Sequence, residues 1–575
     1  MKVAFFFVFV SLVSINPAIS QVNRFEKSGG TETSTYVEVI EWWNQVDKKS
    51  PLIRMHEMGP TDSGFPLHLV LVSNDQSIQL NQLKDNSKSV ILINNGIHPG
   101  EPDGIDASMI LVKNIISGKI KLPNNIILAI VPIYNIGGAL NRSKNYRVDQ
   151  NGPEEFGFRG NARNLDLNRD FIKSDSRNAR SFAKLFHLCM PDIFIDNHVS
   201  NGADYQHVMT LLSTQHSKLG GAMGTYLKET LEPGVYSMMK EKGYDLVPYV
   251  NIMGNTPEKG WNQFFDAPRY SSGYTTLWQS FGFMPETHML KPYKERVAST
   301  LALMEVFIDF TSRNSQAIRA ARKADRENNK FKQEFAINWR PDRSQQSEIT
   351  LKGYEAAYKK SEVSNLERLY YDRTKPFTKT IPFFDYYQPT VTIRKPKAYI
   401  IPQGWWNVIE LLKLNNVQMK TLSRDTMMEV TMYRIEKYVS SASQYEMHHP
   451  NSKVEVSQHQ IKSSFRKGDH LIPMNQDANR FIIEVLEPQG IDSYFSWNFF
   501  DAILGEKEHF SDYVFEETAA ALLKSDPKLK GQLEEKRRSD SSFAKSNGAQ
   551  LDFIYRNSKY FEPEYRQYPV YRIEF

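Results

Sequence analysis

The chain has 575 residues, of which 40% are apolar and 24% are charged, and its formal net charge is +5. This length exceeds what a single hydrophobic core normally supports, so we expect at least two domains. Acidic and basic residues are interleaved without long basic blocks, short basic clusters such as 319–326 alternate with Asp and Glu, and the net charge is small. These features argue against a nucleic-acid partner.

Residues 1–20 have the features of a secretory signal peptide. Lys2 precedes the apolar run 3–13, and the segment ends in Ala18-Ile19-Ser20, with small residues at positions 18 and 20. We therefore expect an exported protein, periplasmic or secreted, whose mature chain begins at Gln21. The alternative is an uncleaved segment that anchors the chain. No later stretch has about 20 consecutive apolar residues, so no membrane span is expected.

The single cysteine, Cys189, rules out an intramolecular disulfide and a zinc site built from thiolates. It lies in the helix-like stretch 179–190. A buried packing role is therefore expected for it, without chemistry.

Alternating strand and helix patterns indicate a parallel sheet in the first half of the chain. The apolar run 90–93 is followed by a helical pattern over 104–118, with Asp103 as a possible N-cap, and by a second apolar run over 126–133. This order predicts a right-handed parallel crossover. A third strand is expected over 192–196. Open sheets of this kind bind ligands beyond the carboxyl ends of their strands.

Candidate metal ligands follow two of these predicted strands. His98 and Glu101 come after the first, and His198 comes directly after the third. Zinc at a catalytic site commonly takes three ligands from His, Asp and Glu. These three residues therefore predict a site for one zinc ion. The alternative for His198 is a strand-end histidine that hydrogen-bonds to a carbonyl.

Two further segments carry chemistry that suits hydrolysis. Glu286, in the segment 283–288, is the expected base that accepts a proton from water, although an exposed carboxylate is the alternative. Asn168 and Arg169 offer an amide and a planar guanidinium that can bind a carboxylate, whereas a surface ion pair is the ordinary explanation. The nearby cationic residues suit an anionic substrate; they are Arg142, Arg147, Arg159 and Arg163.

Taken in chain order, His98-Pro99-Gly100-Glu101, Asn168-Arg169, His198 and Glu286 resemble the signature of the zinc carboxypeptidase family, over about residues 35–310. The resemblance implies an α/β fold with a mixed, largely parallel sheet and helices on both faces. It also implies His98, Glu101 and His198 as zinc ligands and Glu286 as general base and acid. Asn168 and Arg169 would bind the terminal carboxylate of the substrate.

Two positions depart from the family pattern. The family's oxyanion-stabilising arginine would fall near Asn151, so Arg147 is the candidate, with Arg142 as the second choice. Phe264 and Phe265 stand where the family's substrate-closing tyrosine is expected. Two tyrosines lie nearby, Tyr270 and Tyr274, and of these Tyr274 is the candidate for substrate binding.

The second half of the chain is expected to be a separate accessory α/β domain. We place the catalytic domain at 21–325, a charged linker or helix at 326–350 and the accessory domain at 351–575. The runs 398–402, 405–414 and 418–422 predict a strand, a helix and a strand. They faintly resemble amidotransferase-like or flavodoxin-like modules, and no catalytic motif accompanies them.

The function that these features predict is that of a zinc-dependent metallocarboxypeptidase, a hydrolase that removes the C-terminal residue of peptides. Its substrate would be a peptide with a free C-terminal carboxylate, and its water would be activated by zinc and Glu286. One alternative is an amidohydrolase of the same fold that acts on cell-wall peptides or acylamino acids. Another is an inactive protein that binds peptides or glycans.

Overall fold

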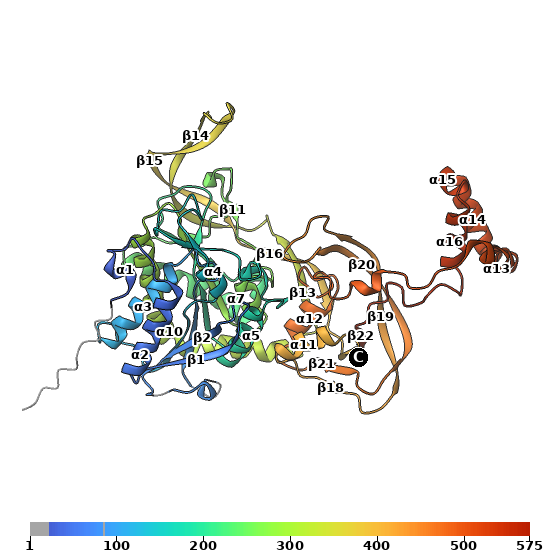
Figure 1. Ribbon diagram of the computed structural model, residues 1–575, viewed down its shortest axis with the longest axis horizontal. Coiled ribbons are helices and arrows are strands. Elements are labelled where there is room, and N and C mark those ends of the chain that lie inside the picture. Colours follow the sequence, from blue (N-terminus) through green and yellow to red (C-terminus); the bar gives the residue numbers. More distant parts are fainter. Residues whose placement is uncertain (1–21, 77, 84–86) are drawn as a thin grey trace, which may run out of the picture.

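The computed structural model describes residues 22–76, 78–83 and 87–575. The expected signal peptide, 1–20, lies outside these residues. Figure 1 shows a large N-terminal body coloured blue to green, a second body coloured orange and a small cluster of helices coloured red.

A mixed sheet forms the centre of the N-terminal body. Within the described residues its order is β1-β2-β4-β3-β7-β12-β9-β10, with β8 paired beside β12. The strands β4, β3, β7 and β12 are parallel to one another. β2 runs antiparallel to β1 and β4, and β9 runs antiparallel to β12 but parallel to β10. The bounds are β1 Ile53–Pro60, β2 Pro66–Val72, β3 Ser89–Asn94, β4 Ile126–Val131, β7 Ile193–Asp196, β8 His198–Ser200, β9 Met209–Ser213, β10 Val247–Pro248 and β12 Phe281–His288.

Helices cover both faces of this sheet, as the fold prediction required. Ile91 and Ile93 of β3 pack into one core with α2 (Tyr36–Lys49), α3 (Asp103–Ile116) and α10 (Tyr293–Phe331), whereas Val90 and Leu92 pack into another with α5 (Arg177–Cys189). Successive side chains of a strand point to opposite faces, so an unbroken apolar run suits a strand covered on both sides. Cys189 is buried in the second of these cores, as predicted.

The prediction that Asp103 caps the N-terminus of α3 is wrong. Pro102 occupies the cap position and makes no side-chain cap bond, and Asp103 is the first helical residue. The Asp103 carboxylate instead accepts hydrogen bonds from Thr287 and from Nε of Arg296, which is 3.1 Å away. A buried cation therefore binds this carboxylate in place of the helix terminus.

The remaining elements of the first 331 residues are short or lie at the periphery. They are α1 Arg24–Lys27, η1 Leu80–Gln82, α4 Ile136–Leu140, β5 Arg142–Ser143, β6 Phe156–Gly157, η2 Leu167–Arg169, α6 His216–Leu219, α7 Gly221–Tyr226, η3 Leu227–Leu231, α8 Glu232–Glu241, η4 Pro257–Lys259, β11 Trp261–Asn262 and α9 Ser271–Thr276.

At the expected boundary near residue 325 the chain is helical, because α10 continues to Phe331, and the segment 326–350 was expected to be a linker or a helix. Residues 326–350 hold the end of α10, then β13 (Glu334–Pro341) and the start of β14 (Ser347–Lys360). β14 and β15 (Glu367–Phe384) form a long hairpin that projects from the N-terminal body (Figure 1). Its base pairs with β11, and β13 with β16 (Tyr387–Arg394) forms a separate ribbon.

Within the expected accessory domain, 351–575, the part from residue 398 onward contains an antiparallel sheet. Its order is β18-β21-β17-β22-β19-β20, and every pairing recorded within it is antiparallel. The bounds are β17 Ala398–Ile401, α11 Trp406–Leu414, β18 Lys420–Thr421, β19 Thr426–Ser440, β20 Asn451–Phe465, β21 His470–Pro473, α12 Asn479–Leu486, η5 Asp501–Leu504 and β22 Tyr571–Ile573.

The predicted strand, helix and strand of the accessory domain are present as β17, α11 and β18. However, β21 lies between the two strands, so they do not pair directly. Flavodoxin-like modules are doubly wound parallel sheets. The structure does not support the likeness to flavodoxin-like or amidotransferase-like modules, because every pairing recorded in this sheet is antiparallel.

A helical cluster is inserted between η5 and β22. It comprises α13 (Asp512–Ser525), α14 (Pro527–Ser539), α15 (Ser541–Ala544) and α16 (Asn547–Arg556), and it has its own small apolar core. Figure 1 shows it at the far end of the molecule. Across the described residues, no helix combines the length and apolar character that crossing a membrane requires.

Candidate metal and substrate site

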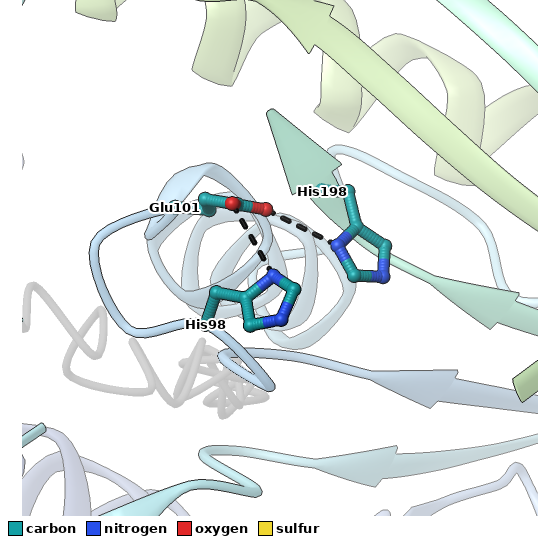
Figure 2. Close-up of side chains that lie close together, drawn as sticks. All are labelled: His98, Glu101 and His198. Atoms are coloured by element: carbon teal, nitrogen blue, oxygen red, sulfur yellow. Dashed lines mark hydrogen bonds and ion pairs between the residues drawn. The ribbon is translucent and has the colours of Figure 1, made fainter. Parts of the chain in front are cut away.

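The three predicted metal ligands meet at one edge of the central sheet. His98 and Glu101 lie in the loop after β3, and His198 is the first residue of β8, just after β7. Because β3 and β7 are parallel neighbours, with Asn94 opposite Asp196, both loops leave the sheet at the same edge. Figure 2 shows the three side chains facing one another.

The distances within this triad suit a metal ion. Nδ1 of His98 lies 3.3 Å from Oε1 of Glu101, and Nδ1 of His198 lies 3.1 Å from Oε2. The candidate ligand atoms all lie within 4.8 Å of one another, and all three side chains are buried. Two imidazoles and one carboxylate are a donor set that zinc commonly takes.

Each histidine ring has an aspartate carboxylate next to its Nε2 atom. Nε2 of His98 is 2.9 Å from Oδ1 of Asp166, and Nε2 of His198 is 3.1 Å from Oδ2 of Asp196. Such a partner orients the ring and leaves the opposite nitrogen, here Nδ1, to bind a metal. The residues therefore fit a zinc ion. Neither aspartate was predicted from the sequence, although a carboxylate at the end of the apolar run 192–196 was a signal for one.

Glu101 is held in the ionised form that a metal ligand requires. Burial works to raise its pKa, but Arg147, His98 and His198 together hold the pKa well below its ordinary value. Burial works to lower the pKa of His198, but Asp196 and Glu101 hold it well above its ordinary value. Metal binding would therefore have to displace a proton from His198.

The triad lines a cavity of about 570 Å³. Glu286, Asn168, Arg169, Arg147 and Arg159 line the same cavity. Its apolar wall includes Leu212, Tyr249, Phe264, Tyr270, Met284 and Met289. The structure thus brings the predicted ligands, the predicted base and the predicted carboxylate-binding pair to one place.

Glu286 lies on β12, in register with His198 of the neighbouring β8. Burial raises its pKa to about 8, with the nearby carboxylate of Glu101 acting in the same direction. His198 and Arg159 oppose the shift. A carboxyl group whose pKa lies near neutral pH can both accept and donate a proton, which is what acid–base catalysis needs.

Asn168 and Arg169 lie in the short helical turn η2, which Asp166 caps by accepting a hydrogen bond from the Asn168 N–H at 2.9 Å. Oδ1 of Asn168 accepts a bond from the Ser271 N–H at 3.4 Å. The Arg169 guanidinium lies over the ring of Tyr270, 4.7 Å from its centroid. Both side chains therefore reach the cavity from a turn with fixed geometry.

Two arginines approach the metal ligands. Nη1 of Arg147 lies 2.9 Å from Oε1 of Glu101, and its side chain runs so close to Gly100 that a Cβ there would lie 2.5 Å from Cδ of Arg147. Nη1 of Arg159 lies 3.4 Å from Nδ1 of His98. Arg142 does not line the cavity and instead donates to the carbonyls of Thr33 and Ser34. The oxyanion role of Arg147 stays a prediction, and Arg159 is a second arginine beside the triad, 3.8 Å from Oε1 of Glu101.

The predicted role of Tyr274 in substrate binding needs correction, because the side chain does not reach the cavity. Its side chain is 1% exposed, and its hydroxyl donates to Oδ1 of Asn415 at 2.6 Å. The helix α9 directs it into the core, where it packs on Phe171 and Phe186. Tyr249 and Tyr270 are the tyrosines that line the cavity.

Comparison with known proteins gives one family and several structures. Residues 39–211 match the profile of the family described as zinc carboxypeptidase. No curated protein matches the chain. A metallo-carboxypeptidase from Burkholderia cenocepacia is 15% identical over 48% of this chain and 69% of its own, with a TM-score of 0.36.

Two further structures are similar to about the same degree. A metallo-carboxypeptidase from Pseudomonas aeruginosa, in complex with (2-guanidinoethylmercapto)succinic acid, is 14% identical over 49% of this chain and 69% of its own, with a TM-score of 0.36. Bovine thrombin-activatable fibrinolysis inhibitor, in complex with tick carboxypeptidase inhibitor, is 14% identical over 49% of this chain and 99% of its own, with a TM-score of 0.37.

Proposed function

Because this chain belongs to the zinc carboxypeptidase family, we propose that it is an active zinc metallocarboxypeptidase, which hydrolyses the C-terminal peptide bond of peptides with a free carboxylate. One observation carries the proposal. A buried triad of His98, Glu101 and His198 shares its cavity with Glu286 and with Arg169, so groups for metal binding, proton transfer and carboxylate binding face one space.

Each group would have a distinct part in the reaction. A zinc ion held by the triad would supply Lewis acidity, which polarises a carbonyl and lowers the pKa of water. Asn168 and Arg169 would bind the terminal carboxylate and so place the last peptide bond near the triad. Glu286 would accept the proton of the attacking water and then donate it to the leaving amine. Arg147 would stabilise the negative charge that develops on the carbonyl oxygen.

The test uses the chain without residues 1–20 and measures bound zinc and peptide cleavage together. We expect one zinc ion per chain and release of C-terminal residues from free-ended peptides but not from their amides. Glu286→Gln should lower kcat by about 10²–10⁴-fold and leave the zinc content unchanged, since it removes proton transfer alone. Glu410→Gln, at an exposed site on α11, is the matched control.

Either of two results would contradict the proposal. Bound zinc without release from any free-ended peptide would favour an amidohydrolase that acts on cell-wall peptides or acylamino acids. Absence of zinc would favour an inactive binding protein.

We also propose export to the periplasm or the medium, on the basis of residues 1–20. N-terminal sequencing of the protein from the native cell tests this proposal. A first residue at or near Gln21 is expected, whereas an intact Met1 would contradict it.

A further inference from the structure

A loop of the accessory domain reaches the carboxylate-binding side of the cavity. It connects β19 and β20 and comprises residues 441–450. The Tyr445 hydroxyl accepts a hydrogen bond from Nε of Arg169 at 2.8 Å, and the Glu446 carboxylate accepts one from the Asp166 N–H at 2.9 Å. Residues about 280 positions apart in the sequence therefore meet beside the site.

The loop is itself held in one shape. The backbones of Tyr445 and His448 exchange two hydrogen bonds, of 2.7 and 3.1 Å, across a tight turn. Glu446 and Met447 complete the turn with φ values of 50° and 69°. Nε2 of His448 lies 2.8 Å from Oδ2 of Asp175 in the N-terminal body. The turn is thus fixed at both ends.

Aromatic and charged contacts fix the ring of Tyr445. It stacks on Trp497, with centroids 6.1 Å apart and an angle of 20°. The Arg269 guanidinium lies 5.7 Å from the Tyr445 centroid and 4.9 Å from that of Trp497. Arg269 in turn binds Asp492 through Nε and its backbone N–H, each at 2.8 Å. The hydroxyl of Tyr445 therefore has little freedom to leave Arg169.

These contacts determine which part of Arg169 can bind substrate. Nε donates to Tyr445, and Nη1 donates to the Asn168 carbonyl at 3.0 Å. Among the residues that the structure describes, Nη2 has no such partner. Because a guanidinium is planar, fixing two of its nitrogens also fixes the direction of the third. The face of the guanidinium rests on Tyr270.

We propose that the accessory domain supplies a positioning residue to the site. Tyr445 holds the Arg169 guanidinium with Nη2 free for the substrate's terminal carboxylate. Glu446 binds the backbone N–H of Asp166, the residue that caps the turn η2 from which Arg169 extends. This inference rests on the proposed function of Arg169. It assigns to the second half of the chain a part in substrate binding, which composition and motifs did not suggest.

The test compares Tyr445→Phe with the parent in the full mature chain. The substitution removes the hydroxyl and keeps the ring packed on Trp497. For an N-acylated dipeptide that ends in phenylalanine, KM should rise about three- to tenfold, as expected for the loss of one positioning hydrogen bond. We expect kcat to change less than about twofold, since Tyr445 does not touch the reacting bond. Zinc content should not change.

Two matched variants separate positioning from a structural effect. Tyr438→Phe alters another tyrosine ring of the same domain, one that lies over Arg566 and away from the cavity, and should leave KM unchanged. Glu446→Gln keeps an acceptor oxygen for the Asp166 N–H, so it should behave like the parent. Glu446→Ala removes that acceptor and should raise KM. An unchanged KM in both Tyr445→Phe and Glu446→Ala would overturn the inference and leave the proposed function intact.

A binding measurement distinguishes failure of the inference from failure of the proposed function. The same dipeptide and its C-terminal amide are titrated into Glu286→Gln, with and without Tyr445→Phe. Tyr445→Phe should weaken binding of the carboxylate form about three- to tenfold and leave the amide unaffected. If the parent does not cleave the dipeptide but this difference appears, the inference stands without the proposed activity. If the variant binds both forms as tightly as Glu286→Gln does, the inference is overturned whatever the activity.

Discussion

The metal triad and the carboxylate-binding pair line one cavity, yet different parts of the chain hold them in place. His98, Glu101 and His198 follow neighbouring parallel strands, and the aspartates behind the histidines also belong to the N-terminal body. Arg169 leaves a short turn and is held by Tyr445 of the accessory domain. The metal ligands and the carboxylates behind them therefore all belong to the first domain, and the second domain reaches this half only through the backbone of Asp166. The substrate half, by contrast, has its Arg169 side chain held by the second domain.

This difference separates what sequence order can reveal from what it cannot. Strand ends of a parallel sheet meet at one edge, so apolar runs followed by ligand residues are enough to locate a metal site. No comparable rule joins a loop near residue 445 to a turn near residue 169. A variant that weakens one half of the site should therefore leave the other half unchanged.

The largest expected effect concerns the metal half alone. Asp196→Asn keeps the size of the side chain but removes the negative charge that faces Nε2 of His198. Zinc affinity should fall about 10–100-fold, as is typical when a carboxylate behind a metal-binding histidine is lost. Competition with a chelator measures it.

Asp309→Asn, at an exposed ion pair with Arg313, is the control and should bind zinc like the parent. Unchanged zinc affinity in Asp196→Asn would show that His198 does not need this support.

A smaller effect is expected at the contact between the two domains. Arg480 of α12 donates to the Lys218 carbonyl at 2.5 Å, and Glu484 is buried on the same helix. Burial raises the pKa of Glu484 from 4.5 to about 7. The folded protein therefore binds this proton more tightly than the unfolded chain does, so the stabilisation is full at low pH and is lost as the pH rises through 7.

Glu484→Gln tests this pH dependence. The parent should lose about 2 kcal/mol of stability from this group between about pH 5.5 and 7.5, and the variant should lack that loss. Thermal unfolding at the two pH values measures the difference. If the parent and the variant showed the same change of midpoint with pH, the protonation of Glu484 would not contribute to the interface.

The smallest effect is expected at Tyr274. Tyr274→Phe removes a hydroxyl that donates to Asn415 in the core, so it should lower stability by about 0.5–1.5 kcal/mol. KM and kcat should match those of the parent, because the side chain does not reach the cavity. Steady-state kinetics beside thermal unfolding checks both parts, and a large fall in kcat would restore the original assignment.

Local pattern was enough to predict three parallel strands of the central sheet and the residues of the triad. The apolar runs 90–93 and 126–133 correspond to β3 and β4, and the three ligands meet as the strand order required. Tyr274 was misassigned because the sequence does not distinguish it from Tyr270, which lies four residues earlier and lines the cavity. Asp103 was misassigned because the buried cation that binds it, Arg296, lies 193 residues away.

The accessory domain was the least predictable part. Its strand, helix and strand were found, but β21, which separates the two strands, comes from about 50 residues later. The contact of Tyr445 with Arg169 spans 276 residues. Pairings of this kind depend on the folded positions of both domains, and short-range periodicity carries no information about them.

The helical cluster α13–α16 leaves and re-enters the accessory domain through a narrow neck. Arg556 pairs with Glu506, and the Lys507 N–H donates to Glu562 at 2.7 Å, so the two ends of the segment are tied together where it joins the sheet. A segment with tied ends and its own core can be shortened, lengthened or exchanged at little cost in loop closure. The neck is therefore a natural grafting point, where a fluorescent or affinity module could replace residues 508–561. The bond between Lys507 and Glu562, which lies outside that range, would still tie the two ends.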